Sequence, residues 1–330
     1  MRALRFSLLV LSLSALLFSC NKELNVNADW KDITVVYGLL DQQDTIHYFK
    51  ITKAFLGPGD AMQFAKIADS SNYPDKLDVT LEAWEGSLLK LSYVCDTVTI
   101  HDKEAGDSIF YYPDQLMYYT RATLNQNYTY KLVIKNKITG KEINAITPLV
   151  HDFEIEKPQG FMVNYQPGRN SEVKWLTAQA GKRYQLTIRF HYAESPKSDP
   201  SQIEMKYIDW IVFNNQRSLN DEGGDPMDFY FPGDAFYMIL GAKIPVNPDV
   251  NRAARHVDYI FSVAAEDLNT YMEVTEPSLS IVQERPSFTN INNGIGIFSS
   301  RFEKVKDSLL LNQNTLTELK VNPYTINLGF

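Results

Sequence analysis

The chain has 330 residues, and its 40 acidic residues outnumber its 32 Lys and Arg residues, giving a formal net charge of −8. Lys and Arg are not concentrated in any segment, which disfavours nucleic-acid binding, because phosphate contacts need a basic patch. The chain contains only two cysteines, too few for a disulfide framework, and its length suits two domains.

The first 19 residues have the three zones of a secretory signal. Arg2 and Arg5 supply positive charge, and an apolar run that includes serines follows from Ser7 to Phe18. The run is too short to cross a hydrocarbon core of ~30 Å as a helix. We therefore predict that residues 1–19 form a signal peptide and are absent from the mature protein.

The end of this signal contains the first cysteine. Leu17, Phe18, Ser19 and Cys20 resemble the bacterial lipobox, in which the cysteine is diacylated and becomes the new N-terminus; Phe18 departs from the small or branched residue usual there. Two or three acyl chains anchor a protein stably. The sequence thus predicts lipid attachment at Cys20 and a polar tether over residues 20–30. The alternative is an incidental cysteine in a cleaved secretory peptide.

Residues 31–153 alternate with a period of two. In 76–83, Leu77, Val79, Leu81 and Ala83 share one face and polar residues share the other, as in a half-buried strand. A second alternation over 128–134, turn residues over 136–140 and an apolar return over 143–146 predict a hairpin. Cys95 lies in a similar pattern and is predicted to be a buried thiol. We predict an immunoglobulin- or fibronectin-like β-sandwich.

Residues 154–330 continue the strand pattern. Tyr184, Leu186, Ile188, Phe190 and Tyr192 alternate with polar residues, and further strands are predicted near 204–213 and 255–265. Asp234 after a Pro-Gly turn predicts a short helix over 235–242, and a second short helix is expected over 266–274. The sequence therefore predicts an all-β protein whose second, β-rich domain carries one or two short helices.

Segments near both ends resemble a known family. They are 33–57, 266–274 and 288–302, and the most specific match is Asn290, Ile291, Gly294, Gly296 and Phe298. Together they resemble an uncharacterised group of Bacteroidota outer-membrane lipoproteins that carry a domain of unknown function. The resemblance implies an all-β lipoprotein, often encoded near TonB-dependent transporters. Independently of it, the glycines predict backbone with positive φ or close approach.

Catalytic and metal-binding motifs are not readable in the chain. The five histidines are dispersed, without the spacing of a zinc site, and no nucleophile elbow, P-loop or dinucleotide fingerprint occurs. We therefore predict no catalytic residues, no metal site and no cofactor. The acidic loop 220–228 is the best calcium candidate, because oxygen-rich loops suit a hard cation, but it lacks the ligand spacing of a known calcium loop and an exposed turn is the default.

Two aromatic runs, 109–120 and 229–237, have more rings than one core face needs. Aromatic faces stack on sugars and are enriched at protein interfaces. Core packing explains alternate members of each run, and the remainder are candidates for ligand or partner contact. These candidates are Tyr111, Tyr112, Tyr230 and Tyr237.

A short repeated pattern predicts possible modification sites. Asp followed by Ser or Thr and an aliphatic residue resembles an O-glycosylation sequon of the same bacterial group, although ordinary turn chemistry also produces such matches. The acceptors would be Thr45, Thr97, Ser108 and Ser308.

Taken together, these features predict a non-catalytic binding or accessory protein anchored by lipid to the outer membrane. Surface exposure is favoured, although the residues after Cys20 only faintly resemble a surface-export signal. The expected partners are a TonB-dependent transporter or a glycan or peptide ligand. Two alternatives remain open: a fimbrillin-like structural or adhesive subunit, which would offer a strand for exchange, and a hydrolase acting on glycan or peptide, which would gather carboxylates or a perturbed histidine in a deep pocket.

Overall fold

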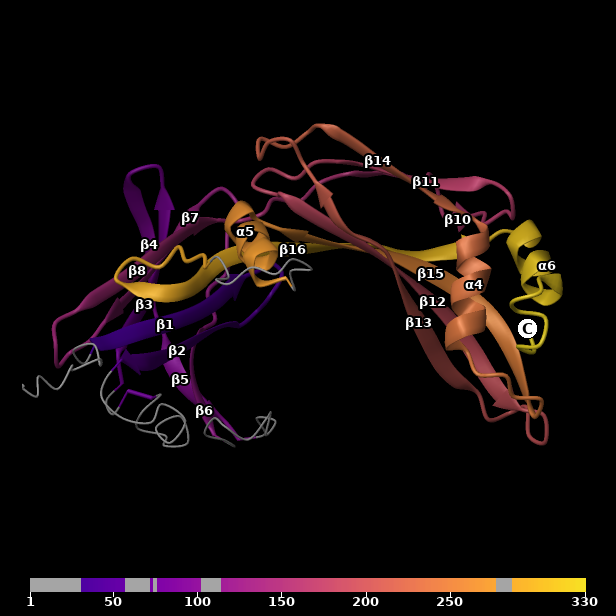
Figure 1. Cartoon of the computed structure of the whole chain (residues 1–330), viewed down its shortest axis with the longest axis horizontal. Coiled ribbons are helices and arrows are strands. Elements are labelled where there is room, and N and C mark those ends of the chain that lie inside the picture. Colours follow the sequence, from indigo (N-terminus) through magenta and orange to yellow (C-terminus); the bar gives the residue numbers. More distant parts are fainter. Residues whose placement is uncertain (1–30, 57–71, 74–75, 102–113, 277–286) are drawn as a thin grey trace, which may run out of the picture.

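The computed structural model describes residues 31–56, 72–73, 76–101, 114–276 and 287–330. Strands make up 53% of these residues and helices 11%, so the prediction of a mostly β protein is confirmed. The molecule is elongated, with a β-rich body at each end of its long axis (Figure 1). The indigo and purple strands build most of the N-terminal body, which an orange segment joins, and the magenta to yellow strands build the C-terminal body.

The N-terminal body contains two groups of strands. Strands β4, β3, β7 and β8 form a four-stranded sheet in that order, and β1, β2, β6 and β5 follow one another at one end of a longer sheet. The strands are β1 (Lys31–Leu40), β2 (His47–Leu56), β3 (Asp78–Glu85), β4 (Leu88–Val94), β5 (Asp96–Ile100), β6 (Gln115–Thr120), β7 (Thr129–Lys135) and β8 (Glu142–Pro148).

Local sequence explains these strands well. Leu77, Val79, Leu81 and Ala83 are all buried, as the alternation around β3 predicts. The predicted hairpin is β7 and β8, which pair antiparallel. Its loop is closed by Asn136, whose N–H donates to the Lys141 carbonyl and whose side chain accepts from the Ile138 N–H at 2.9 Å.

The C-terminal body contains long strands and three helices. Strands β13, β12, β15 and β16 follow one another in the long sheet, and β14, β11 and β9 form a separate sheet. The elements are β9 (Ile155–Lys157), β10 (Met162–Val163), β11 (Asn170–Leu176), β12 (Arg183–Pro196), β13 (Glu204–Arg217), β14 (Pro226–Pro232), α4 (Asp234–Lys243), β15 (Val250–Ala264), α5 (Glu266–Thr275), β16 (Gly294–Leu311) and α6 (Gln313–Val321).

Two of the helices were predicted and one was missed. α4 and α5 coincide with the segments 235–242 and 266–274, which confirms both. The described residues contain three helices, so the expectation of one or two was too low. α6 starts after Asn312, whose side chain accepts a hydrogen bond from the Thr315 N–H at 2.9 Å. That N-cap is a local signal.

Strand β16 belongs to both bodies. Its residues 294–300 pair in parallel with 34–40 of β1, and its residues 301–310 pair antiparallel with β15. One sheet therefore continues from β13 to β5 through the junction (Figure 1). The domain boundary between 153 and 154 stays a prediction, and the pairing adds that a C-terminal segment completes the N-terminal body.

The two hydrophobic cores follow the same division. Trp175, Tyr184 and Phe261 lie at the centre of the C-terminal core. The N-terminal core contains buried residues from β1, β2, β3, β6, β7 and β8, and it also contains Ile291 and Phe298 from the last part of the chain. Removing a strand from a core leaves a cavity lined by apolar atoms, which is strongly destabilising. The N-terminal body therefore depends on residues 291–298.

The segment that resembles the lipoprotein family has structural roles. Gly296 has a φ of +113°, and a Cβ there would overlap the backbone of Val36, which confirms the predicted need for glycine. Asn290 lies beside Phe298: its side-chain nitrogen donates to the Phe298 carbonyl at 2.7 Å, and its oxygen accepts from the Phe298 N–H at 3.0 Å. The same nitrogen donates to Asp267 of α5. The motif thus holds β16 and α5 together.

Candidate functional site

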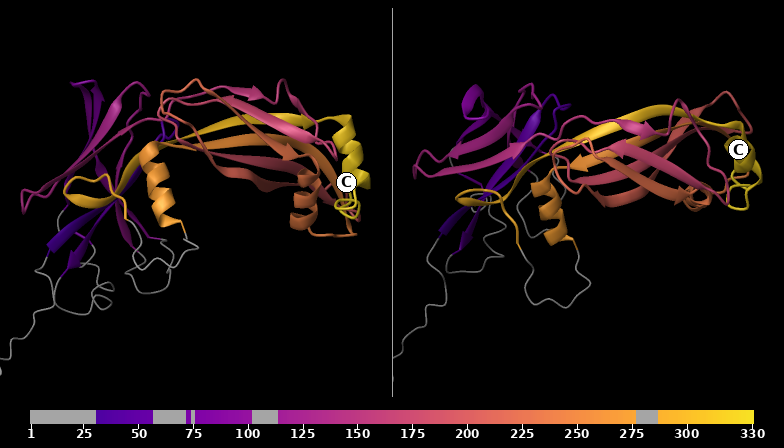
Figure 2. Two further views of the ribbon diagram at one scale, coloured as in Figure 1. Left: turned by 45° about the horizontal axis from the view of Figure 1, so that its top comes forward. Right: turned by 90° about the horizontal axis from the view of Figure 1, so that it is seen from above.

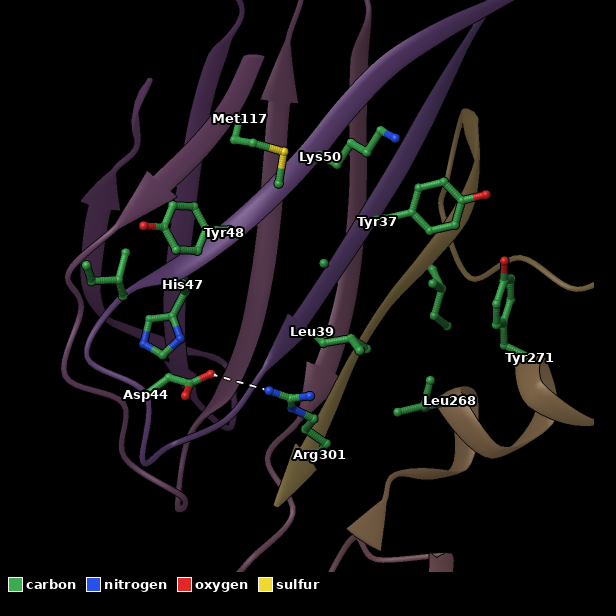
Figure 3. A pocket seen from close by; sticks show the side chains of 13 residues that line it. Tyr37, Leu39, Asp44, His47, Tyr48, Lys50, Met117, Leu268, Tyr271 and Arg301 are labelled. Atoms are coloured by element: carbon green, nitrogen blue, oxygen red, sulfur yellow. Dashed lines mark ion pairs between the residues drawn. The ribbon is translucent and has the colours of Figure 1, made fainter. Parts of the chain in front are cut away.

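A pocket of about 470 Å³ lies between the N-terminal body and α5. α5 sits between the two bodies in each view of Figure 2. Figure 3 shows the side chains of β1, β2, β6, β16 and α5 that surround the pocket. The lining residues are Tyr37, Gly38, Leu39, Asp44, Ile46, His47, Tyr48, Lys50, Met117, Leu268, Tyr271, Ile297 and Arg301.

Strand alternation explains which β1 residues reach this pocket. Val36 and Leu40 are fully buried in the N-terminal core, whereas Tyr37 is 41% exposed on the opposite face. Tyr48 of β2 is 43% exposed and contacts the ring of Tyr119 with 6.1 Å between centroids. One face of the sheet therefore holds the core, and the other presents tyrosine rings to the pocket.

Helix α5 supplies the opposite wall. Leu268 and Tyr271 are three residues apart on this helix and therefore share one face of it. The ring of Tyr271 meets the ring of Tyr37 edge to face, with 6.5 Å between centroids and 77° between planes. Burial, followed by a hydrogen bond with Tyr271, raises the pKa of Tyr37, so the Tyr37 hydroxyl stays protonated at neutral pH.

A second pocket of about 480 Å³ shares Tyr37 and Tyr271 with the first. Its other walls come from the end of α5, from 287–289 and from the start of β16; they are Val274, Thr275, Ser287, Phe288, Thr289, Ile295 and Gly296. We call the two pockets together the tyrosine groove. The Tyr37–Tyr271 pair is the wall common to both.

The end of the groove near the β1–β2 turn carries opposite charges. Arg301 lies 3.9 Å from carboxylate oxygens of both Asp44 and Asp41 (Figure 3 draws the Asp44 pair). Asp41 is 4% exposed, and burial raises its pKa, although the Gln43 N–H donates to it at 3.0 Å. Lys50 also lines the pocket, so two cationic side chains stand beside two carboxylates and neither sign of charge dominates this wall.

His47 is a buried member of the groove wall. It is 1% exposed, and burial lowers its pKa, which favours the neutral imidazole. Its Nε2 donates to the Ala122 carbonyl at 3.0 Å, so Nδ1 is left as an acceptor. Among the described residues, Nδ1 has no hydrogen-bond partner. An unsatisfied buried acceptor costs about 1–3 kcal/mol.

The tyrosines predicted to contact a ligand are not the ones that line the groove. Tyr237 is fully buried in α4, and its hydroxyl donates to the Tyr165 carbonyl at 2.6 Å, so its ring belongs to the core and presents no exposed surface to a ligand. Tyr230 of β14 is 54% exposed and hydrogen-bonds Glu172, away from both pockets. Tyr111 and Tyr112 lie outside the described residues.

The predicted glycosylation sites and the two cysteines lie in different parts of the chain. Thr45 is exposed in the β1–β2 turn, Thr97 is half-buried in β5, and Ser308 is exposed in β16. Cys20 and Ser108 lie outside the described residues. Cys95 is buried, and burial raises the pKa of its thiol to about 12. Lipid attachment at Cys20 and glycosylation at the Ser and Thr positions stay predictions.

The acidic loop 220–228 is organised as a turn. The Asn220 side chain donates to Asp225 at 2.9 Å, and the Asp225 N–H donates to Thr177 at 2.9 Å. Its carboxylates do not converge within metal-ligand distance, and in the described part of the chain the residues that do are His191, His256 and Asp258.

Sequence reasoning missed Tyr37, Tyr48 and Tyr271. The alternation of β1 contains a signal, since it places Tyr37 out of phase with the buried Val36 and Leu40. Nothing local indicates that α5 packs beside β1, because that proximity arises from the parallel pairing of β16.

Comparison with known proteins finds no family profile that matches the chain and no curated protein with significant similarity. Within the described residues, each helix is too short or too polar to cross a membrane.

Proposed function

We propose that the chain is a non-catalytic binding protein, anchored to the outer membrane by lipid on Cys20 and exposed at the cell surface. The signal-like residues 1–19 and the cysteine that follows them support the anchor. The Asn290–Phe298 segment supports membership of the uncharacterised Bacteroidota lipoprotein family, and with it an association with a TonB-dependent transporter. The two strand groups of the N-terminal body support an immunoglobulin- or fibronectin-like sandwich there.

The tyrosine groove is the proposed binding site, and the Tyr37–Tyr271 pair is the observation that carries the proposal. Three tyrosines line the first pocket, where their rings provide flat apolar faces and their hydroxyls provide hydrogen bonds. The Arg301–Asp44 ion pair balances charge at the end of the groove. Flat rings with balanced polar groups suit a neutral, hydroxyl-rich ligand, so a neutral oligosaccharide is the ligand class we propose.

The experiment is capture by the full-length lipoprotein in detergent, tested on an array of neutral oligosaccharides and on solubilised outer membranes. We expect the double variant Tyr48→Ala, Tyr271→Ala to lose at least about tenfold in glycan affinity, since each ring contact is worth on the order of 1 kcal/mol. Tyr324→Ala is the matched control, because Tyr324 is 53% exposed in the C-terminal body and does not line the groove.

Two outcomes would count against this function. Equal glycan binding by the wild type and the groove double variant would place the site elsewhere. Recovery of neither glycan nor transporter would remove the binding role itself. Membrane retention of Cys20→Ala at the wild-type level would separately contradict the lipid anchor.

A hydrolase is the second candidate, because the first pocket contains Asp44 and the neutral His47. The geometry favours it less. The His47 Nε2 is already bound to the Ala122 carbonyl, and Asp44 is paired with Arg301. A general base has to reach the proton that it abstracts. Turnover of nitrophenyl glycosides or peptides that Asp44→Asn abolishes would favour the hydrolase over the binding protein.

A further inference from the structure

A cluster of two histidines and one aspartate lies on the long sheet in the C-terminal body. His191 is on β12, and His256 and Asp258 are on the neighbouring strand β15. Phe190 pairs with Val257, but Tyr192 pairs with Ala254, so the register shifts beside His191. Such a bulge sets two residues of one strand against one residue of the other. This bulge places His256 beside His191. Asp258 lies two residues after His256 on the same strand and therefore projects from the same face of the sheet.

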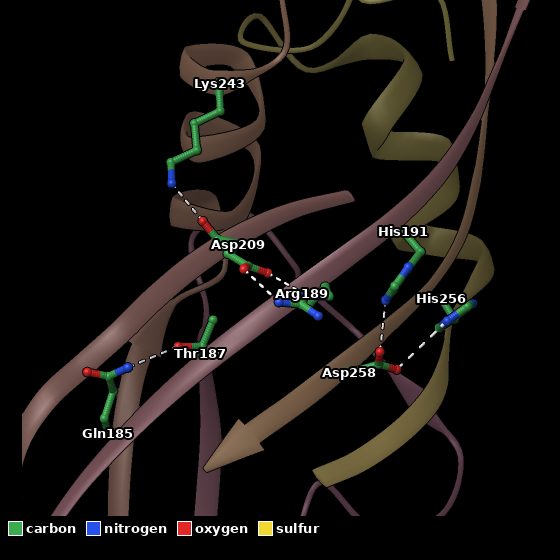
Figure 4. Close-up of polar contacts among 8 residues, drawn as sticks. All are labelled: Gln185, Thr187, Arg189, His191, Asp209, Lys243, His256 and Asp258. Carbon is green, nitrogen blue, oxygen red and sulfur yellow. Dashed lines mark hydrogen bonds and ion pairs between the residues drawn. The ribbon is translucent and has the colours of Figure 1, made fainter. Parts of the chain in front are cut away.

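The side chains of the cluster converge on the carboxylate (Figure 4). The Nε2 of His191 lies 2.8 Å from one Asp258 oxygen, and the Nε2 of His256 lies 3.8 Å from the other. The two imidazole rings are stacked, with 4.4 Å between centroids and 19° between planes. One ligand atom from each residue falls within 4.8 Å of the others.

The surroundings hold this carboxylate in place. The Ser308 N–H donates to the Asp258 oxygen nearer His256 at 2.8 Å, and Ser308 has a φ of +55° at a second register shift, between β15 and β16. The side chain of Asp258 is 15% exposed, and those of His191 and His256 are 23% and 31% exposed. The cluster is thus fixed by backbone and still open to solvent.

We propose that His191, His256 and Asp258 bind a divalent zinc-type metal ion. Two imidazole nitrogens and one carboxylate oxygen are a donor set that zinc and neighbouring transition metals prefer, with a remaining position for water or a ligand atom. Calcium and magnesium prefer sites built from oxygen. The ion would take the place of the hydrogen between the His191 Nε2 and Asp258, which would pass to the other ring nitrogen or to water. The Ser308 N–H would orient the carboxylate from outside, as supporting groups do in metal sites.

The positive charge of Arg189, beside the cluster, does not prevent a metal ion from binding there. Arg189 of β12 is paired with both oxygens of Asp209 at 2.7 and 2.8 Å, and its guanidinium lies over the ring of Tyr207 at 4.4 Å from the centroid. Its charge is therefore compensated next to the cluster. The ion pair also leaves Asp209 out of the donor set, which restricts the site to three protein ligands.

The test is titration of ZnCl₂ into the full-length chain, purified in detergent without a histidine tag and freed of metal with a chelator. Calorimetry reports stoichiometry and affinity, and thermal denaturation with and without ZnCl₂ reports the shift in melting temperature. The variants are His256→Gln and Asp258→Asn. His101→Gln is the matched control, because the Nδ1 of His101 pairs with Asp114 at 2.9 Å on the N-terminal body, where no second histidine joins it among the described residues.

We expect one zinc ion per wild-type chain and a higher melting temperature with zinc, because a ligand that binds only the folded state stabilises it. Each cluster variant should lose at least about tenfold in affinity, since even supporting groups are worth about 10- to 100-fold, and His101→Gln should match the wild type. Melting without metal checks that each variant folds. No binding at ~100 μM ZnCl₂, equal binding by the cluster variants, or displacement of zinc by a tenfold excess of CaCl₂ would overturn the site.

Discussion

Gly296 lies opposite Val36 in the parallel pairing of β1 with β16, so close that any side chain on Gly296 would overlap the Val36 backbone. The φ of +113° at Gly296 is a conformation that residues with a Cβ rarely adopt. This contact is where the C-terminal strand joins the N-terminal body, and Gly296 also lines the second pocket of the tyrosine groove.

Gly296→Ala is therefore expected to lower the free energy of unfolding by about 3 kcal/mol or more. Backbone strain accounts for about 1–3 kcal/mol, and overpacking adds a similar amount. Gly86→Ala is the matched control, because Gly86 also has a positive φ of +56°, but a Cβ added there would meet no atom within 4 Å; its cost should stay near 1–2 kcal/mol. Urea denaturation measures the free energy of unfolding of both variants. Equal losses in the two variants would contradict the close contact between Gly296 and the Val36 backbone.

Arg252 connects three parts of the C-terminal body. Its side chain is 1% exposed, and it donates to Glu194 at 2.8 Å, to the Pro245 carbonyl at 3.0 Å and to the Leu328 carbonyl. Removing the guanidinium leaves the Leu328 and Pro245 carbonyls without this donor, whereas Glu194 keeps its ion pair with Lys206 at 2.6 Å. Because each unsatisfied buried acceptor costs about 1–3 kcal/mol, we expect Arg252→Ala to cost about 2–5 kcal/mol of stability.

Arg189 provides the comparison for Arg252. It forms a two-pronged pair with Asp209 on the next strand, but its side chain is 34% exposed. Exposed ion pairs contribute about 0–1 kcal/mol. Urea midpoints for Arg189→Ala should therefore stay close to the wild type, and a loss as large as that of Arg252→Ala would show that burial does not decide the difference.

Buried tyrosines predict a loss of stability in alkali. Burial raises the pKa of Tyr184 to about 12, and it also raises the pKa of Tyr165 and Tyr259. In the unfolded chain these hydroxyls ionise near pH 10. Between about pH 10 and 12 the unfolded state therefore binds fewer protons than the folded state, so stability is full below this range and falls as pH rises through it.

Tyr184→Phe tests this prediction. The variant should show a shallower decline of the urea midpoint above about pH 10. At neutral pH it should lose about 1–3 kcal/mol, because the Ala178 N–H that donates to the Tyr184 oxygen at 2.7 Å is left without a partner. Tyr324→Phe, at a position 53% exposed, should change neither quantity. If the urea midpoint of Tyr184→Phe fell with pH as steeply as that of the wild type, Tyr184 would not be a source of the alkaline loss of stability.

The thiol of Cys95 should be inert in the folded protein. It is 9% exposed, and burial raises its pKa to about 12, so little reactive thiolate forms at neutral pH. We expect no fast reaction with a disulfide reagent at about pH 8 and full reaction in urea. The Cys20→Ala variant retains Cys95 as its single thiol. Fast labelling of this folded variant would show that Cys95 is not buried.

The same thiol reaction, carried out in urea, shows whether Cys20 carries lipid, because it counts the free thiols in each chain. Protein isolated from membranes should present one reactive thiol per chain in urea, because a Cys20 sulfur converted to a thioether no longer reacts. Two thiols per chain would show that Cys20 is free. Labelling with radioactive palmitate provides an independent measurement of the same modification.

Local patterns determined much of the secondary structure. The alternation around β3, the β7–β8 hairpin, and helices α4 and α5 were all predictable, because strand and helix periods and turn residues act over a few neighbouring positions. α6 carried the same kind of signal in its Asn312 cap. The need for glycine at Gly296 was also predictable, although its partner Val36 was not.

Only the tertiary structure decided which distant segments meet. The parallel pairing of β16 with β1 brings Tyr271 to Tyr37, and the bulge between β12 and β15 brings His191 to His256 and Asp258. Neither proximity leaves a trace in local periodicity, because strand order and register depend on contacts between residues far apart in the chain. For the same reason Tyr237 resembled a surface residue in the sequence, whereas the packing of α4 buries it.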